Sequence, residues 1–140
     1  MTVYLDASIL VALFTRDHLS ARADAFLRSS LPVLVVSNFA AAEFSSALAR
    51  RVRTGEMTPD DARLAFSNFD AWTSRSTQPA ELVAADVAAA QAFLRRLDLT
   101  LRTPDALNIA IALRIGAELA TFDEKMAASA HLLGARISAA

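Results

Sequence analysis

The chain has 140 residues, a formal net charge of −1 and no cysteine. This length predicts a single domain over residues 1–140, because it suffices for one compact core and leaves no room for a second domain of ordinary size. The small net charge gives no bulk sign of a nucleic-acid partner, and the lack of cysteine excludes disulfides, thiolate zinc sites and a cysteine nucleophile. Any metal would bind oxygen ligands or the two histidines, which favours magnesium or manganese.

The apolar segments are too short to cross a membrane, although hydrophobic residues make up 54% of the chain. The longest runs, Ile9–Phe14 and Leu31–Val36, fall far short of the roughly 20 residues that a bilayer requires. The first residues lack the basic flank and the small-residue cleavage site of a secretory signal. We therefore expect a cytoplasmic protein without a membrane span.

In the first half of the chain, β-prone runs alternate with segments of helical periodicity. Thr2–Leu5 is predicted to form a strand that ends at Asp6. Ile9–Phe14 is predicted to continue as a buried helix entered through Ser8. Further along, the pattern predicts a helix over His18–Ser30, a strand over Val33–Val36 that is buried on both faces, a helix from Ser37 or Asn38 to about Gly55, and a helix from Thr58 to about Ser74.

The second half continues the alternation less regularly. Ser76–Pro79 is expected to be a loop, and Glu81–Ala85 fits either a short strand, which we favour, or the start of a helix. The remaining predictions are a helix capped by Asp86 that runs to Leu97, a helix with Thr103 as cap, Pro104 as first residue and Asp105 as first-turn acid that Gly116 ends, a strand over Glu118–Phe122, a short helix after Asp123, and an edge strand over Ala135–Ser138. This alternation predicts an α/β fold with a mostly parallel sheet of four to five strands.

Four carboxylates follow apolar segments that resemble strands, or lie in the first turns of the next helix. They are Asp6, Glu43, Asp105 and Asp123. Because the carboxyl ends of parallel strands share one edge of a sheet, we expect these acids to meet there. Two like charges about 4 Å apart repel by about 4 kcal/mol at an effective dielectric of about 20, so that the cluster needs protons or a cation between its members. Taken singly, each acid also fits a structural role at a turn or a helix start.

A divalent cation is the natural partner of such a cluster. Magnesium and manganese bind carboxylates, keep water in their remaining positions and accept phosphate oxygens as further ligands. Metals about 3.5–4 Å apart activate an attacking water and stabilise the leaving oxygen of an in-line displacement at phosphorus. The acids therefore favour phosphodiester hydrolysis as the reaction.

Four segments together resemble the PIN-domain ribonucleases, and among these most of all the VapC toxins of bacterial type II toxin–antitoxin systems. The segments are Val3-Tyr4-Leu5-Asp6-Ala7-Ser8, residues 38–44 around Glu43, residues 101–110 around Asp105, and Thr121-Phe122-Asp123. The match covers essentially the whole chain in the same order and spacing. The resemblance implies a PIN-like three-layer α/β/α domain.

The resemblance also implies an endoribonuclease that depends on Mg²⁺ or Mn²⁺ and leaves 5′-phosphate and 3′-hydroxyl ends. Its catalytic acids and metal ligands would be Asp6, Glu43, Asp105 and Asp123, with Ser8 and Thr121 as hydrogen-bonding support. Asn108 stands one turn after Asp105 and could face the same pocket, at a position where close relatives often have histidine. The implied partners are an RNA substrate, a second copy in a homodimer, and a cognate VapB-type antitoxin whose own domain would bind operator DNA.

Among the basic residues, Lys125 is the only lysine, and arginine suits phosphate because its planar fork donates parallel hydrogen bonds. Two groups stand out, namely Arg50, Arg51 and Arg53 near a helix end, and Arg95, Arg96 and Arg102 before the Asp105 helix. Both groups also fit solvated helix ends. Arg102 is the predicted substrate contact, because it precedes an acid of the site by three residues.

Other interpretations of the same residues remain open. The domain could be a phosphatase or phosphotransfer domain with Asp6 as nucleophile, or a catalytically inert binding module with an acidic ion site. His18 and His131 are interpreted as surface residues. Phe66, Phe69 and Trp72 have helical spacing, which favours core or dimer packing over base stacking.

Overall fold

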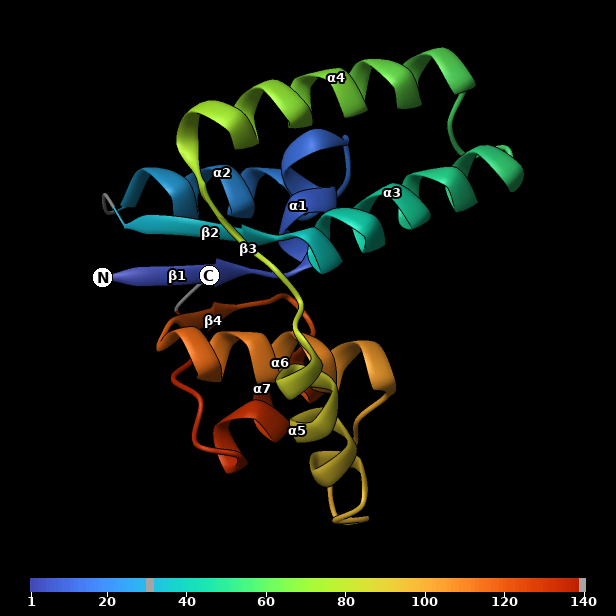
Figure 1. Ribbon diagram of the computed structural model, residues 1–140. Helices are drawn as coiled ribbons and strands as arrows, with labels where there is room; N and C mark the ends of the chain where they lie inside the picture. The colour runs from blue at the N-terminus through green and yellow to red at the C-terminus, as the bar shows by residue number, and fades with distance from the viewer. Residues whose placement is uncertain (30–31, 139–140) are drawn as a thin grey trace.

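The computed structural model describes residues 1–29 and 32–138, in which strands and helices alternate (Figure 1). The elements are β1 (Thr2–Leu5), α1 (Ala7–Phe14), α2 (Ser20–Ser29), β2 (Val33–Ser37), α3 (Asn38–Arg53), α4 (Pro59–Ser76), β3 (Gln78–Ala80), α5 (Ala84–Leu94), α6 (Thr103–Ile115), β4 (Glu118–Ala120) and α7 (Glu124–Leu132). The predicted helix end at Ser30 and the first residue of the Leu31–Val36 run lie outside the described residues. Within the described ranges, no helix combines the length and the apolarity that a membrane span requires.

The strands of the described residues form one parallel sheet with the order β3-β2-β1-β4. In the middle of this sheet, Tyr4 of β1 pairs with Val35 of β2 on one side and with Leu119 of β4 on the other. Strand β3 extends the far edge of β2, where Val36 pairs with Pro79. The predicted α/β class with a parallel sheet of four to five strands is thereby confirmed.

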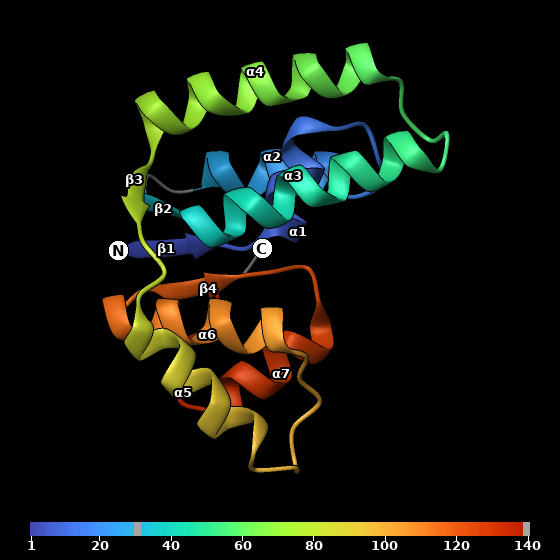
Figure 2. The same ribbon diagram turned by 45° about the vertical axis from the view of Figure 1, so that its right-hand side comes forward.

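Helices cover both faces of the sheet. Helices α1 to α4 lie on one side and α5 to α7 on the other, as Figures 1 and 2 show. The connections from β1 to β2 and from β2 to β3 run one way across the sheet, and the connection from β3 to β4 runs back. Right-handed crossovers therefore place the two sets of helices on opposite faces. The three-layer α/β/α arrangement is confirmed.

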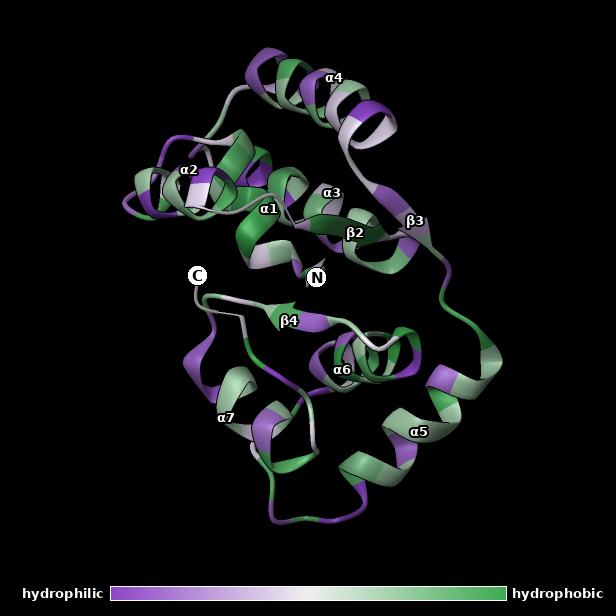
Figure 3. Ribbon diagram, turned by 90° about the vertical axis from the view of Figure 1, so that its left-hand side faces the viewer, coloured by the Kyte–Doolittle hydropathy of each residue, from purple (hydrophilic) through white to green (hydrophobic). Residues whose placement is uncertain are grey.

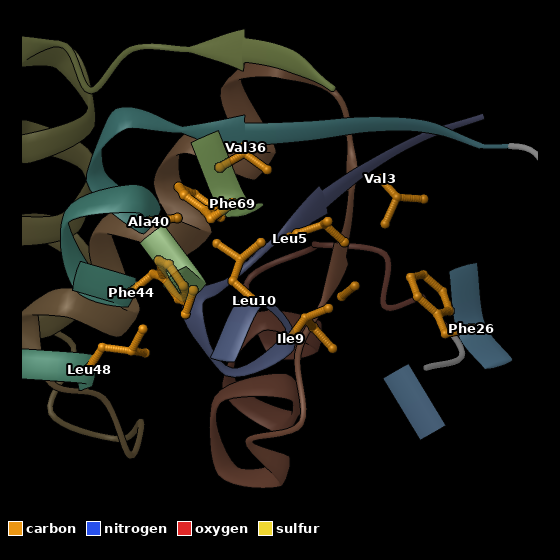
Figure 4. Close-up of a cluster of buried hydrophobic side chains, with 12 residues drawn as sticks. Val3, Leu5, Ile9, Leu10, Phe26, Val36, Ala40, Phe44, Leu48 and Phe69 are labelled. Carbon is orange, nitrogen blue, oxygen red and sulfur yellow. The ribbon is translucent and has the colours of Figure 1, made fainter. Parts of the chain in front are cut away.

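Alternate side chains of β1 enter different layers, as the two-residue period of a strand requires. Val3 and Leu5 belong to the core under α1, α3 and α4, which Figure 4 shows, whereas Tyr4 belongs to the core under α6 and α7. Strand β2 is hydrophobic over most of its length (Figure 3), although Val33 at its start is 40% exposed, so the prediction of burial on both faces holds only for its later residues.

The aromatic residues of α4 pack into the first core, as predicted. The ring of Phe69 lies 4.4 Å from that of Phe44 and 5.5 Å from that of Phe14, between centroids. Trp72 contacts Phe14 and Phe66 contacts Phe44, each edge to face. These rings tie α1, α3 and α4 together, which fixes α3 against the sheet.

The start of α1 differs from the prediction. The N-cap is Asp6 and not Ser8, because the Asp6 carboxylate accepts a hydrogen bond from the backbone N–H of Ile9 at 3.3 Å. An N-cap acceptor normally reaches the second or third N–H of its helix, and Asp6 satisfies this spacing. An acid of the expected site therefore also begins a helix.

Helices α5 and α6 do not begin with the polar cap residues that were predicted. Asp86 and Asp105 each lie at the third helical position, and each carboxylate reaches back to the backbone N–H before the helix, at Val83 (2.9 Å) and Arg102 (3.0 Å) respectively. This is the acidic half of a capping box, which a first-turn carboxylate can form without a polar cap residue. Asp86 is therefore not itself the cap, and Thr103 is the first helical residue of α6.

Two predicted strands in the second half are wrong. The strand lies at Gln78–Ala80, partly in the expected loop, and Glu81–Ala85 is not a strand. Pro79 fits there because β3 is an edge strand, which needs a hydrogen-bonding partner on one side only. Strand β4 ends at Ala120, two residues early, and the segment Ala135–Ser138 contributes only an isolated bridge between Leu119 and Ile137.

Candidate active site

Most of the predicted site residues come from segments that follow the carboxyl ends of strands, whereas Asp105 and Asn108 lie on α6, which follows α5. Asp6 directly follows β1, Thr121 directly follows β4, and α3, which carries Glu43, directly follows β2. Figure 1 shows α3 and the first turn of α6, from opposite faces of the sheet, projecting past the same end of β1 and β2. Parallel strands therefore bring these segments to one edge, as the fold class requires.

Asp6 is almost completely buried, at 5% exposure, and its carboxylate is held by side-chain hydroxyls. Ser8 donates to Oδ1 at 2.6 Å and Thr121 donates to Oδ2 at 2.5 Å. Burial raises the pKa of Asp6 from its ordinary value, and these hydrogen bonds lower it without cancelling the rise. The predicted supporting roles of Ser8 and Thr121 thus match contacts with Asp6.

The same two hydroxyls fix the loop after β4. The backbone N–H of Phe122 donates to Ser8 Oγ at 2.9 Å, and that of Asp123 donates to Thr121 Oγ1 at 3.0 Å. The Asp123 carboxylate itself accepts from the N–H of Met126 at 3.0 Å and caps α7. Asp123 is therefore joined to Asp6 through its backbone, while its carboxylate has a structural task.

Glu43 and Asn108 meet across the sheet edge. Asn108 Nδ2 donates to Glu43 Oε1 at 2.6 Å and to the carbonyl oxygen of Pro104 at 3.0 Å. The Asn108 side chain is buried at 3% exposure, and Glu43 is half-buried. Asn108, which could face the same pocket as Asp105 by its position, thus contacts one of the predicted acids.

The electrostatics of Glu43 connect three acids. Burial raises the pKa of Glu43, the hydrogen bond from Asn108 lowers it, and the negative charges of Asp6 and Asp105 raise it further, against a lowering by Arg102. Like charges at Asp6 and Asp105 thus act on the Glu43 carboxylate from two other segments of the chain. The structure brings these three acids into one electrostatic neighbourhood.

Each of the three acids keeps acceptor capacity. No described residue donates a hydrogen bond to Glu43 Oε2 or to Asp105 Oδ1, and Asp6 Oδ2 accepts only from Thr121. A carboxylate offers about four lone-pair positions, so that each acid retains an oxygen for another partner. In the described part of the chain, however, no three acidic or histidine side chains converge closely enough to hold a metal ion as they stand. His18 and His131 are exposed, as predicted.

A groove of about 680 Å³ begins at Glu43. It is lined by four arginines, which are Arg50, Arg51, Arg53 and Arg102. Arg51 lies 3.5 Å from Asp17 and Arg102 3.8 Å from Asp105, while Arg50 and Arg53 form no ion pair with the described residues. Arg95 and Arg96 line a different hollow on α5, so that the two arginine groups seen in the sequence divide between two surfaces.

The sequence did not indicate that Tyr4 belongs to the site, nor that Ser37, considered only as a possible cap of α3, contacts Tyr4. The Tyr4 hydroxyl lies 2.6 Å from Ser37 Oγ and donates to Asn108 Oδ1 at 2.5 Å, directly behind the contact between Asn108 and Glu43. One signal was available, namely the phenolic hydroxyl of Tyr4 between the apolar residues Val3 and Leu5. A buried tyrosine needs a hydrogen-bond partner, but that partner is decided by tertiary structure.

Comparison with known proteins agrees with this geometry. A family model described as the PIN domain matches residues 3–132. None of the curated proteins matched the sequence. Among solved structures, the chain is similar to VapC20 of Mycobacterium tuberculosis, described as a toxin that cleaves the sarcin–ricin loop, with 23% identity, 91% of this chain and 94% of that chain covered, and a TM-score of 0.74.

Two VapBC structures are also similar to this chain. One is VapBC2 of Rickettsia felis bound to a promoter DNA fragment, with 15% identity, 99% and 98% of the two chains covered, and a TM-score of 0.71. The other is VapBC-1 of nontypeable Haemophilus influenzae, with 14% identity, 99% and 97% coverage, and a TM-score of 0.69. At these identities the likeness shows a shared fold. With the family match over nearly its whole length, the chain belongs to the PIN domain family.

Proposed function

We propose that this protein is a metal-dependent endoribonuclease that hydrolyses phosphodiester bonds in RNA. The observation that carries the proposal is the convergence of charge on Glu43, whose pKa is raised by burial and by Asp6 and Asp105. Acids that repel one another are retained where a cation or a reaction needs them. The similarity to VapC20, a toxin described as cleaving the sarcin–ricin loop, supports RNA as the substrate class.

The donor chemistry of the site fits Mg²⁺ or Mn²⁺. Both are hard cations that prefer oxygen, and Mg²⁺ is commonly held by one or two carboxylates while water fills its other positions. That mode agrees with acids that each keep a free oxygen without forming a three-ligand cluster. Asp6, Glu43 and Asp105 would hold the ion directly or through water, and Asp123 through water. When bound, such an ion supplies a polarised water and neutralises charge at phosphorus.

The residues of the chain position the substrate. Ser8 donates to one oxygen of the Asp6 carboxylate and Thr121 donates to the other. These two bonds fix the orientation of the carboxylate and of the lone pair that remains free. The Arg102 side chain is 82% exposed at the mouth of the groove and is free to donate to a phosphate oxygen. The arginines of α3 continue this path away from Glu43. We infer that RNA enters along this groove and places its scissile phosphate between Glu43 and Asp105.

The biological role that we propose is that of a toxin. The structures of similar fold include VapC20, which is described as a toxin, and two VapBC structures, one of them bound to promoter DNA. We propose a VapB-type antitoxin as partner, a homodimer as the working form, and contact with operator DNA only through the antitoxin. Expression of the wild-type chain alone should then arrest growth, co-expression of the neighbouring antitoxin gene should relieve the arrest, and Asp6→Asn should not be toxic. Unimpaired growth at high soluble yield of the wild type would contradict the toxin role.

A cleavage assay tests the enzymatic proposal. We expect purified wild type to cleave RNA with Mn²⁺ and to lose all activity in EDTA, with Asp6→Asn and Asp105→Asn reduced by about 100-fold or more. The matched control is Asp98→Asn, an exposed acid that pairs with Arg96 beyond α5 and should leave the rate unchanged. Cleavage that persists in EDTA, or in Asp6→Asn, would contradict the proposal. A phosphorylated Asp6 would instead support the phosphotransfer alternative.

A further inference from the structure

A chain of hydrogen bonds lies directly behind the candidate active site. The backbone N–H of Ala40 donates to Ser37 Oγ at 2.9 Å, Ser37 Oγ lies 2.6 Å from the Tyr4 hydroxyl, and this hydroxyl lies 2.5 Å from Asn108 Oδ1. Asn108 Nδ2 completes the chain at Glu43 Oε1. Tyr4 and Ser37 are fully buried and Asn108 nearly so, and no buried side-chain polar atom of the described residues lacks a partner.

The direction of this chain follows from what each group can donate. The carbonyl oxygen of Pro104 only accepts, so the amide nitrogen of Asn108 must face it, and the same nitrogen then faces Glu43. The opposite atom, Asn108 Oδ1, only accepts, so Tyr4 must donate its single proton to it. Ser37 must in turn donate to Tyr4, because the single proton of the Tyr4 hydroxyl is already donated to Asn108.

The chain of bonds starts and ends on the same helix. Ala40 lies in the first turn of α3 and Glu43 in the next, while Tyr4 belongs to β1 and Asn108 to α6. Helices α3 and α6 cover opposite faces of the sheet, as Figure 2 shows, so the bonds join the two outer layers across the end of β1. A small shift of α3 against α6 would break the contact at Glu43.

Resting on the proposed nuclease function, we propose that Tyr4 is a positioning residue that holds the Asn108 amide in the orientation that donates to Glu43. Without the Tyr4 hydroxyl, the buried Asn108 Oδ1 loses the donor that the described residues supply, and an unpaired buried acceptor is unfavourable. The side chain then gains by turning Oδ1 toward water or another donor, which moves Nδ2 away from the Glu43 carboxylate. Glu43 then loses the single side-chain donor that fixes it within the described residues.

Kinetics of Tyr4→Phe, which keeps the ring and removes only the hydroxyl, test this role. We expect kcat to fall by about tenfold or more while KM for RNA stays within about twofold, since displacing a catalytic group by about 1 Å has effects of this size. The control is Thr77→Val, which removes a half-buried hydroxyl bonded to the Thr73 carbonyl at the end of α4, and it should match wild type. An unchanged kcat, or an equal loss in the control, would overturn the proposal.

A double-mutant cycle shows whether Tyr4 acts through Asn108. Asn108→Asp keeps the size of the side chain but replaces the donor facing Glu43, so its kcat should fall at least as far as that of Tyr4→Phe. In the Asn108→Asp background, Tyr4→Phe should then cause no further loss. Losses that multiply would mean that Tyr4 acts by another route and would refute the positioning role.

Amide NMR tests the same orientation without activity. In the wild type, the Asn108 side-chain NH₂ protons should exchange slowly, whereas those of exposed Gln91 on α5 exchange fast. In Tyr4→Phe the Asn108 protons should lose their protection. Fast exchange of Asn108 in the wild type, or unchanged protection in Tyr4→Phe, would contradict the proposal. This readout holds even if the wild type cleaves no RNA, so failure of the nuclease function and failure of the positioning role are distinguishable.

Discussion

At the scale of single residues, Asp6 combines a structural role with a functional one. It caps α1 and its charge acts on Glu43, although that charge is unfavourable where it is buried. Its raised pKa means that the folded state binds the proton more tightly than the unfolded state does. Stability contributed at this position therefore falls as pH rises from about 3.9 through the raised pKa.

Asp6→Asn is predicted to fold and to be at least as stable as the wild type at neutral pH. Asparagine caps helices about as well as aspartate, and the substitution removes a buried charge. In metal-free buffer the thermal midpoint at pH 7 should equal or exceed that of the wild type, and the difference should shrink as pH falls through the raised pKa of Asp6. A clearly lower midpoint at pH 7 would show that the ionised carboxylate stabilises the fold.

The acids and the side chains beside them, Ser8, Thr121 and Asn108, could be proposed from the sequence, but the hydrogen bonds behind them could not. Asp6 and Glu43 each follow a recognisable strand, so that fold class alone brings them to one edge. Tyr4 lies in an apolar run that only indicates burial. Its bond to Asn108 spans 104 positions of the chain, and no local pattern encodes such a contact. Tertiary packing likewise decides that the Asp123 carboxylate caps α7, and that the Thr121 hydroxyl bonds both the Asp6 carboxylate and the backbone of Asp123.

At the scale of elements, the failure at β3 has a simple physical origin. Its residues, Gln78–Ala80, are mostly exposed and show no apolar alternation. The strand exists because β2 offers an unpaired edge to its backbone. The predicted caps of α5 and α6 were wrong because a carboxylate at the third helical position can take the place of a polar cap residue. Long apolar elements such as α3 and α6 were predicted nearly to the residue.

Helices α5 and α6 are joined by an ion pair between Asp86 and Arg114. Arg114 donates to both carboxylate oxygens of Asp86, at 2.8 and 3.0 Å, and Asp86 is 1% exposed. Burial alone would raise the pKa of Asp86, but the hydrogen bonds from Arg114 and Val83 and the charge of Arg114 lower it overall. The carboxylate is therefore more acidic in the folded state than in the unfolded one.

Asp86→Asn is predicted to destabilise the protein by about 2 kcal/mol at pH 7, less than a fully buried pair because the Arg114 side chain is 36% exposed. The contribution is present above about pH 3.9 and is lost as pH falls through the lowered pKa. Urea unfolding at pH 7 and at pH 3 measures both values. A deficit that is equal at the two pH values would contradict an ionic origin.

The aromatic cluster of α1, α3 and α4 should contribute most of the packing energy of its layer. Phe69→Ala removes a ring at 5% exposure from the cluster in Figure 4 and should cost about 3–5 kcal/mol. Leu64→Ala, on the same helix but 62% exposed, should change stability by less than about 0.5 kcal/mol. Urea unfolding of the pair separates burial from helix propensity, and similar losses in both would contradict the assigned core.

At the scale of the whole molecule, a nearly neutral chain concentrates positive charge on one groove. Arg50→Gln and Arg53→Gln should weaken binding of single-stranded RNA in EDTA and reduce the slope of log affinity against log salt by about 0.7 for each lost phosphate contact. Arg95→Gln, on the other surface, is the matched control. An unchanged slope in the groove variants, or an equal change in the control, would place the RNA path elsewhere.

The central claim is that one sheet edge gathers Asp6, Glu43 and Asp105 into a site for a dication. Titration calorimetry with Mn²⁺ tests it most directly. The wild type and Asp98→Asn should bind the ion alike, and Asp6→Asn, Glu43→Gln and Asp105→Asn should each weaken binding by about tenfold or more, because affinity follows the number of charged ligands. A wild type that takes up no Mn²⁺, or three variants that bind it as the wild type does, would contradict the account.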